Sequence, residues 1–311
     1  MDDPRSDGDR HEVRLPYRPP LAIGALIDFL AARAVPGVES VVDGGYQRVL
    51  RLPGGPAVVS LHAENGDRDA ARQRRDGGRD GDAGDAAGVI RCRMQLADPR
   101  DREEAVAACR RLLDLDADPG AVDDALGADP VLAPLVAATP GRRAPVHVDA
   151  AELAIRAVLG QQVSLAAARG LAARLAELCG EPLHAPTGTL ARAFPSPAAV
   201  AEADLDRIGM PGSRRATLRA LATALADGSI DLGPAAPADE AEARLLGLRG
   251  IGPWTASYIR MRGLGDPDVL LDTDLGVRHA LTRLGLAGAD LAGRWRPWSS
   301  YAVHHLWASL G

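Results

Sequence analysis

Two carboxylates stand close together before a predicted helix near the end of the chain. Asp272 and Asp274 lie in VLLDTDLGVR, residues 269–278, and Asp274 directly precedes the helical pattern LGVRHALTRL. A helix N-terminus favours an ionised carboxylate by about 0.3–1 kcal/mol. Such a group can stabilise positive charge that develops during a reaction and can orient or deprotonate water. An ordinary N-cap has the same pattern, so the residues alone leave both interpretations open, with Asp272 as the alternative position.

Aromatic side chains are scarce and are concentrated in the same region. They form 3% of the sequence, and six of the ten lie between residues 254 and 307: Trp254, Tyr258, Trp295, Trp298, Tyr301 and Trp307. Trp254 and Tyr258 are four residues apart, so they share one face of a helix. An aromatic pocket attracts a cationic ligand by about 0.5–2 kcal/mol. Core packing is the other interpretation, and we assign Trp295 and Trp307 to the core.

A glycine-rich turn joins two predicted helices in LLGLRGIGPWTASYIRMRG, residues 245–263. Gly250 and Gly252 flank Ile251, which permits a tight hairpin and a close backbone approach. Pro253 suits the first position of the second helix. The N–H groups exposed at that helix start favour an anion such as a phosphate. An ordinary helical corner is the alternative, and the two glycines by themselves favour it.

The elements that must position these groups are mostly helical. From residue 101 onward the pattern predicts short helices joined by short loops. Residues 15–62 combine one helical segment with strand-like segments, and VIRCRMQL at 89–96 alternates again. We therefore expect a mostly α protein with an N-terminal α+β domain over 15–100 and a helical region over 101–311.

Two segments are expected to lie outside these domains. Residues 1–14 are charged and predict a disordered tail, and residues 64–88 consist almost entirely of Gly, Ala, Asp and Arg. Such a low-complexity composition predicts a mobile surface insertion.

Composition excludes several classes of protein. No apolar run of the 311 residues reaches the roughly 18 that a membrane span needs, and the N-terminus lacks the apolar core of a signal peptide. We therefore expect a cytoplasmic protein. Three cysteines without a C-x-x-C pair argue against a zinc ribbon, a disulfide framework and a four-thiolate iron–sulfur cluster. The net charge of −6 does not favour nucleic acid, although binding depends on local patches.

All basic side chains other than histidine are arginines, because the sequence contains no lysine. A Schiff base requires an amine, so no lysine can act as a covalent nucleophile here.

Several motifs together resemble the helix–hairpin–helix (HhH-GPD) DNA glycosylases, and among them the DNA-3-methyladenine glycosylase II (AlkA) family. The segments are FLAARAVPGVESV at 29–41, AIRAVLGQQVS at 154–164, IGMPGSRRATL at 208–218, LRGIGPWTA at 248–256, VLLDTDLGVR at 269–278 and RPWSSYAVHHLW at 296–307. The resemblance extends from about residue 15 to the C-terminus, apart from the 64–88 insertion. It implies a small antiparallel-sheet domain followed by two helical subdomains, with the hairpin motif at about 240–263 and the active site between the subdomains.

The resemblance also assigns roles to residues. It makes Asp274 the catalytic carboxylate, and it places three aromatic side chains in the walls of the base pocket: Trp254, Tyr258 and Trp298. DNA contacts fall on the two turns and their flanks, at Gly250, Gly252, Gln161, Gln162, Arg214, Arg215 and Arg249. Arg260 and Arg262 also flank the hairpin and could reach phosphates.

Two further features follow from the resemblance. Gln162 takes the position of the wedge that fills the gap left by an extruded base. It departs from the best-known family member, which has an apolar residue there. The hairpin of this family often holds a monovalent cation through backbone carbonyls, which here would belong to Leu246, Leu248 and Ile251. No other cofactor is required, and a metal site at His304 and His305 is not expected.

The function implied is that of a monomeric, monofunctional DNA glycosylase that flips and excises alkylated purines from double-stranded DNA. Family members with lyase activity carry a lysine at the position of Trp254, so water must be the nucleophile here and an abasic site the product. Two alternatives remain at this point: a catalytically silent DNA-binding module, and a glycosylase for deaminated or oxidised bases. The latter needs hydrogen bonds to a neutral base edge, and the sequence does not identify a residue that would supply them.

Overall fold

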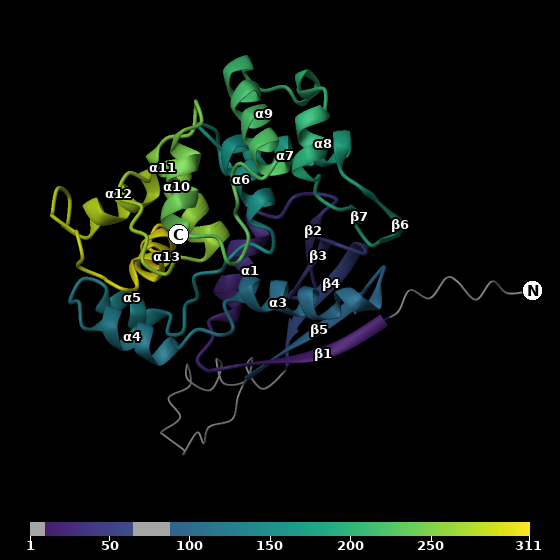
Figure 1. Ribbon diagram of the computed structural model, residues 1–311. Coiled ribbons are helices and arrows are strands. Elements are labelled where there is room, and N and C mark those ends of the chain that lie inside the picture. Colours follow the sequence, from purple (N-terminus) through teal and green to yellow (C-terminus); the bar gives the residue numbers. More distant parts are fainter. Residues whose placement is uncertain (1–9, 65–87) are drawn as a thin grey trace, which may run out of the picture.

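The computed structural model describes residues 10–64 and 88–311, and within these ranges the first unit is an antiparallel sheet with strand order β1–β5–β4–β3–β2 (Figure 1). Its strands are β1 (Arg10–Tyr17), β2 (Glu39–Val42), β3 (Gly45–Leu52), β4 (Gly55–Ala63) and β5 (Gly88–Gln95). Two helices, α1 (Ile23–Ala31) and α3 (Arg102–Leu113), share one apolar core with the sheet. This is the expected N-terminal α+β domain.

The structure corrects both boundaries predicted for this domain. Residues 10–14 are not part of a disordered tail, because they form the first half of β1, where Val13 pairs with Cys92 of β5. At the other end, α3 belongs to the sheet domain and not to the helical region, since Leu112 and Leu113 are buried in the core of the sheet. Residues 65–87, most of the predicted insertion, lie outside the described residues.

The second unit is helical and has its own apolar core. It contains α6 (Ala150–Leu159), α7 (Leu165–Cys179), α8 (Pro197–Glu202), the 3-10 turn η2 (Leu205–Ile208), α9 (Gly212–Ala226), α10 (Ala238–Leu246) and α11 (Pro253–Ile259). A short hairpin, β6 (Pro182–Thr187) and β7 (Leu190–Arg192), packs on β3. The helices α10 and α11 carry the glycine-rich turn.

The third unit combines segments from both sides of the second. Two helices that precede α6 in the chain, α4 (Pro119–Gly127) and α5 (Ala133–Ala138), share a core with α12 (Leu275–Arg283) and α13 (Ser299–Ala308). Figure 1 shows α4 and α5 beside α13, with the chain then crossing to α6. The two helical cores correspond to the two subdomains implied by the resemblance. Short turns η1 (Pro99–Asp101) and η3 (Arg260–Leu264) complete the described elements.

A buried ion cluster joins the sheet domain to α6. Arg48 of β3 donates to Glu152 of α6 at 2.7 Å and to Glu39 of β2 at 3.3 Å, and Arg156 of α6 donates to Glu39 at 3.1 Å. Removing any one partner would leave an uncompensated buried charge, so the cluster fixes α6 relative to the sheet. No helix in the described ranges has both the length and the apolar character of a membrane span.

Candidate active site

Asp274 is the N-cap of α12 and is held by N–H groups on both carboxylate oxygens. Within the described chain, Oδ1 accepts from the backbone N–H of Val277 at 2.9 Å and from Trp307 Nε1 at 2.8 Å, while Oδ2 accepts from Trp254 Nε1 at 2.9 Å. We call Trp254 and Trp307 the indole clamp. Hydrogen bonds to an ionised acceptor are about twice as strong as neutral ones, so the clamp and the N-cap together fix the orientation of this carboxylate.

The structure separates Asp274 from its sequence neighbours. Asp272 is exposed and does not line the cavity described below. Gly276 lies against the clamp, because a Cβ there would approach Asp274 Oδ1 and Trp307 Cδ1, each at 3.1 Å. A larger residue would push the indole away, so this glycine permits the hydrogen bond between Trp307 and Asp274, which the sequence analysis did not predict.

The aromatic wall of the site consists of Trp254, Tyr258 and Trp307. The Trp254 and Tyr258 rings stack at 5.3 Å with an interplanar angle of 12°, and Tyr258 lies 6.4 Å from Trp307. Phe29 of α1 extends this wall, since its ring stacks on Trp307 at 6.3 Å. The assignment of Trp307 to the core is therefore incomplete: this side chain packs against the core of the third unit, but it also lines the cavity and donates to Asp274.

Trp298, expected in the pocket wall, is elsewhere. It packs edge-on against Tyr301 at 5.5 Å in the core of the third unit and does not line the cavity. Trp298 lies at the start of α13 and Trp307 near its end. A spacing of nine positions is about 13 Å along a helix, so the two side chains cannot reach the same site. Trp295 and Tyr301 are also core residues, with their polar atoms bonded to Asp129 and Asp114.

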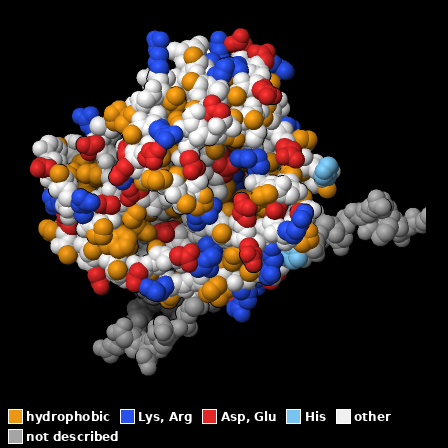
Figure 2. Space-filling view, in the orientation of Figure 1, with side chains coloured by type: hydrophobic (Ala, Val, Ile, Leu, Met, Phe, Trp, Pro, Cys, Tyr) orange, Lys and Arg blue, Asp and Glu red, His pale blue; other side chains and the backbone are white. Residues whose placement is uncertain are grey.

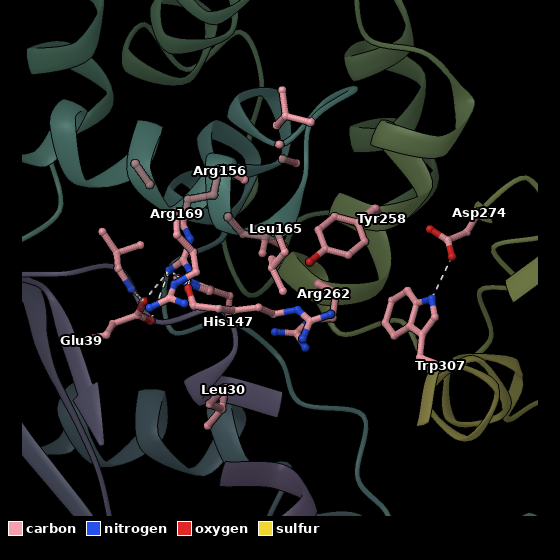
Figure 3. A pocket seen from close by; sticks show the side chains of 18 of the residues that line it. Leu30, Glu39, His147, Arg156, Leu165, Arg169, Tyr258, Arg262, Asp274 and Trp307 are labelled. Carbon is pink, nitrogen blue, oxygen red and sulfur yellow. Dashed lines mark hydrogen bonds and ion pairs between the residues drawn. The ribbon is translucent and has the colours of Figure 1, made fainter. Parts of the chain in front are cut away.

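A cavity of about 290 Å³ opens beside Asp274, between the two helical units and the sheet domain. Figure 3 shows Tyr258 and Arg262 in its middle, with Asp274 and Trp307 at one end and Glu39 and Arg156 at the other. Apolar side chains complete the lining, among them Leu30, Val35, Leu153, Val163 and Leu165. Its size is close to the lower end of the usual range for ligand pockets, roughly 300–1,000 Å³.

Two arginines, Arg33 and Arg262, line this cavity, and we call them its floor. Arg33, in the turn after α1, and Arg262 of η3 both lie over the Phe29 ring, with Cζ atoms 3.7 Å and 4.6 Å from its centroid. Arg262 is only 3% exposed, and burial lowers its pKa to about 10. It stays protonated at neutral pH. Burial also lowers the pKa of Arg33. Arg262 is therefore unavailable to backbone phosphates, contrary to the role suggested by its place beside the hairpin.

Arg260 and Arg262 lie on the same π-helical turn, but their side chains have different surroundings. The turn η3 directs Arg262 into the cavity, while Arg260 faces an acidic group and donates to Asp239, Glu242 and Asp266 at 2.6–2.9 Å. Single π-helical turns are frequent at functional sites. Arg260 is thus held by ion pairs within the protein, and no local pattern in the sequence distinguishes it from Arg262.

The glycine-rich turn is braced from both sides. Gly250 has a φ of +93°, and a Cβ there would collide with Thr217 Oγ1, which donates to the Arg249 carbonyl at 3.0 Å. Gln161 Nε2 donates to the Gly250 carbonyl and to Thr255 Oγ1, both at 3.0 Å. Gln161, expected to contact DNA, is thus bonded to the hairpin in this structure.

Gly252 differs from Gly250, because nothing in the described chain lies within 4 Å of a Cβ built on it. Its backbone is extended and needs no glycine for folding. A steric requirement for glycine at this position would have to come from a group outside the chain.

The other predicted DNA contacts lie on the α6–α7 turn, at the start of α9 and, for Arg249, in the hairpin between α10 and α11. Gln162 is exposed with a φ of +55°, a conformation uncommon for residues other than glycine. Arg249 is exposed and Arg214 half-buried, but Arg215 is held by Asp206 and the Met210 carbonyl, each at 2.7 Å. Figure 2 shows basic and acidic side chains interspersed over the face in view, so that face has no single basic patch.

The predicted cation site involves the carbonyls of Leu246, Leu248 and Ile251. Leu246 ends α10, and the Leu248 carbonyl already accepts the Ile251 N–H at 3.1 Å, which leaves it one lone pair for an ion.

Among the described residues, Glu39, His147 and Glu152 are close enough together to hold a metal ion. Arg48 and Arg156, however, already form ion pairs with the two carboxylates. His304 and His305 are buried, and burial lowers the pKa of both.

Two protein-family models match most of the chain. Residues 12–149 match the AlkA N-terminal domain, and residues 155–293 match the HhH-GPD superfamily of base excision DNA repair proteins. Over 303 residues the chain is 46% identical to the "probable bifunctional transcriptional activator/DNA repair enzyme AlkA" of Mycobacterium tuberculosis, covering 96% of this chain and 57% of that relative. This chain therefore spans little more than half of that protein.

One further relative and one solved structure match over nearly their whole length. DNA-3-methyladenine glycosylase 2 of Escherichia coli is 35% identical over 303 residues, which cover 96% of this chain and 97% of that protein. The 3-methyladenine DNA-glycosylase of Archaeoglobus fulgidus has the same fold, with a TM-score of 0.75 at 20% identity and coverage of 96% and 97%. The chain belongs to the AlkA (DNA-3-methyladenine glycosylase 2) family of HhH-GPD proteins.

Proposed function

We propose that this protein is a monofunctional DNA glycosylase that excises alkylated purines from double-stranded DNA. One observation carries the proposal. The indole clamp orients the carboxylate of Asp274, which lies at one end of an aromatic cavity beside a helix–hairpin–helix turn. This arrangement brings a group that stabilises positive charge next to a pocket that can hold a flat base. The family relationship supports the same activity.

Asp274 acts on the sugar in this scheme. Cleavage of the bond between C1′ and N9 sends its electron pair to the base and leaves positive charge on the sugar ring. A carboxylate fixed before the reaction stabilises that charge without reorganising, which is where preorganised groups contribute most. The same carboxylate can orient the water that attacks C1′ or accept its proton.

Water is the nucleophile because the chain has no lysine. Trp254 occupies the hairpin-helix position where lyase-active family members carry the amine, and it donates to Asp274 instead. The DNA strand therefore remains intact after base loss, and the product is an abasic site.

DNA contacts are supplied by the hairpin and the α6–α7 turn. Gly252 leaves room for a phosphate at the N-terminus of α11, where unpaired N–H groups favour an anion. Gln162 can fill the gap in the duplex and hydrogen-bond the unpaired base. Arg249 and Arg214 are placed to contact neighbouring phosphates, and a monovalent cation at the hairpin carbonyls would add to this site. The protein acts as a monomer in the cytoplasm.

The direct test is incubation of the chain with methylated duplex DNA, followed by chromatography of the released bases. We expect 3-methyladenine and 7-methylguanine in the supernatant and an uncleaved strand that breaks at abasic sites only after alkali. DNA binding without any base release would instead identify a catalytically silent DNA-binding module.

A further inference from the structure

The cavity beside Asp274 carries an excess of positive charge. Among the described residues that line it are four arginines and two carboxylates: Arg33, Arg156, Arg169, Arg262, Glu39 and Asp274. Arg156 and Glu39 form an ion pair at 3.1 Å within the buried cluster. The two arginines on the floor, Arg33 and Arg262, form none of the ion pairs found in the described chain.

Arg262 is the less compensated of the two. Its Nε and Nη1 atoms are buried and lack a hydrogen-bond partner among the described residues, whereas Arg33 donates to the Phe29 carbonyl at 3.2 Å. The backbone N–H of His147 donates to the Arg262 backbone carbonyl at 2.7 Å, and this bond does not involve the guanidinium group. A buried cation without hydrogen bonds or a counter-ion destabilises a fold. Such a group calls for an explanation, and its place in the cavity points to a ligand.

Such a floor does not suit a cationic base. A 7-alkylpurine carries a positive charge, which the aromatic wall attracts but the two guanidinium groups repel. The positive charge of the floor must therefore benefit a different kind of leaving group.

The charge of the departing base depends on its starting state. In both cases the C1′–N9 bond breaks, its electron pair passes to the base, and water bonds to C1′ and loses a proton. A cationic 7-alkylpurine leaves as a neutral molecule. A neutral purine leaves as an anion, which then takes a proton from solvent water. Only in the second case does negative charge develop on the base within the cavity.

We infer that Arg262, supported by Arg33, is a specificity-determining residue that stabilises the negative charge on neutral bases as they leave. The inference rests on the proposed glycosylase function and names the residue that sets the relative rates on uncharged and cationic bases. Preorganised donors aimed at developing charge are worth more in a water-poor cavity than in solvent. The same guanidinium groups lower the advantage of cationic bases.

The test compares two 6-oxopurines in duplexes with identical flanking sequence: hypoxanthine, which leaves as an anion, and 7-methylguanine, which leaves neutral. Both carry the C6 carbonyl, so recognition of that oxygen affects them alike. For Arg262→Met in the full chain, we expect the ratio of the single-turnover rate on hypoxanthine to that on 7-methylguanine to fall about 100-fold. Arg33→Met should shift the ratio in the same direction.

Arg260→Met is the matched control. It removes an arginine from the same π-helical turn, but one that faces Asp239, Glu242 and Asp266 and not the cavity. The ratio of the two rates should stay unchanged in this variant. The thermal unfolding midpoint of Arg262→Met should equal or exceed that of the unmodified chain, because an unpaired buried charge is lost.

The outcomes separate the inference from the function on which it rests. If the unmodified chain excises neither base, the proposed function fails. If it excises 7-methylguanine but not hypoxanthine, or if Arg262→Met and Arg33→Met leave the ratio unchanged or lower both rates equally, the inference alone is overturned.

Discussion

The indole clamp gives the sharpest prediction about the site, because one substitution removes a hydrogen bond and keeps the aromatic wall. Trp307→Phe deletes the Nε1–H that donates to Asp274 Oδ1 at 2.8 Å, while a six-membered ring remains beside Tyr258. A hydrogen bond to a charged group contributes about 1.5–3 kcal/mol. Each 1.4 kcal/mol of transition-state stabilisation corresponds to about a tenfold change in rate, so the loss should lower the rate about 10- to 100-fold.

The assay is single-turnover release of 7-methylguanine from a defined duplex, with DNA affinity measured in parallel. Trp298→Phe is the control, since this residue lies at the other end of α13 and packs in the core. Its rate should stay within about threefold of the unmodified chain, a change of roughly 0.6 kcal/mol. The reasoning is refuted if Trp307→Phe excises normally, or if Trp298→Phe loses more activity than Trp307→Phe.

The remaining predictions concern the nucleophile, the phosphates and the hairpin. Borohydride should trap no protein–DNA adduct when the terminal α-amino group is blocked, because the sequence offers no other aliphatic amine; a robust adduct on a gel would refute this. DNA affinity measured by anisotropy should fall with salt, with a log–log slope of about −0.9 per phosphate, and Arg249→Met should reduce the slope by about one; an unchanged slope would remove Arg249 from the interface. Gly250→Ala should destabilise the fold by about 1–3 kcal/mol in urea, owing to its positive φ and the contact with Thr217. Gly252→Ala should unfold like the unmodified chain but bind DNA less tightly, and equal binding would exclude a phosphate there.

Local sequence patterns predicted the positions of many residues in the site. Asp274 precedes a helix, Trp254 and Tyr258 share a face, and the two glycines form the turn, as their types and spacing indicate. The structure places the first three around one cavity. Each of these expectations depends on residues within one or two helical turns of each other, where geometry follows directly from the helical repeat.

The errors arose where tertiary packing decides. Trp298 and Trp307 lie on the same helix, and periodicity cannot say which end of that helix faces the cavity. Residues 10–14 look like a charged tail, yet Val13 alternates with charged neighbours and pairs with β5. The helix α3 has a normal amphipathic pattern, which does not identify the core that it joins.

Arg33 and Arg262 were missed as cavity residues for a different reason. Arginine is mostly exposed in proteins, so sequence reasoning assigns it to the surface or to phosphates. Only the three-dimensional arrangement shows that both guanidinium groups lie over Phe29 beneath the aromatic wall.

The account depends most directly on the carboxylate of Asp274. The decisive measurement is the single-turnover excision rate of Asp274→Asn on a 7-methylguanine duplex, alongside its affinity for the same DNA and the rate of Asp272→Asn. We predict a loss of about 10²–10³-fold or more for Asp274→Asn, nearly unchanged DNA binding, and normal excision by Asp272→Asn. Near-normal turnover by Asp274→Asn, or loss of excision in Asp272→Asn instead, would contradict the account.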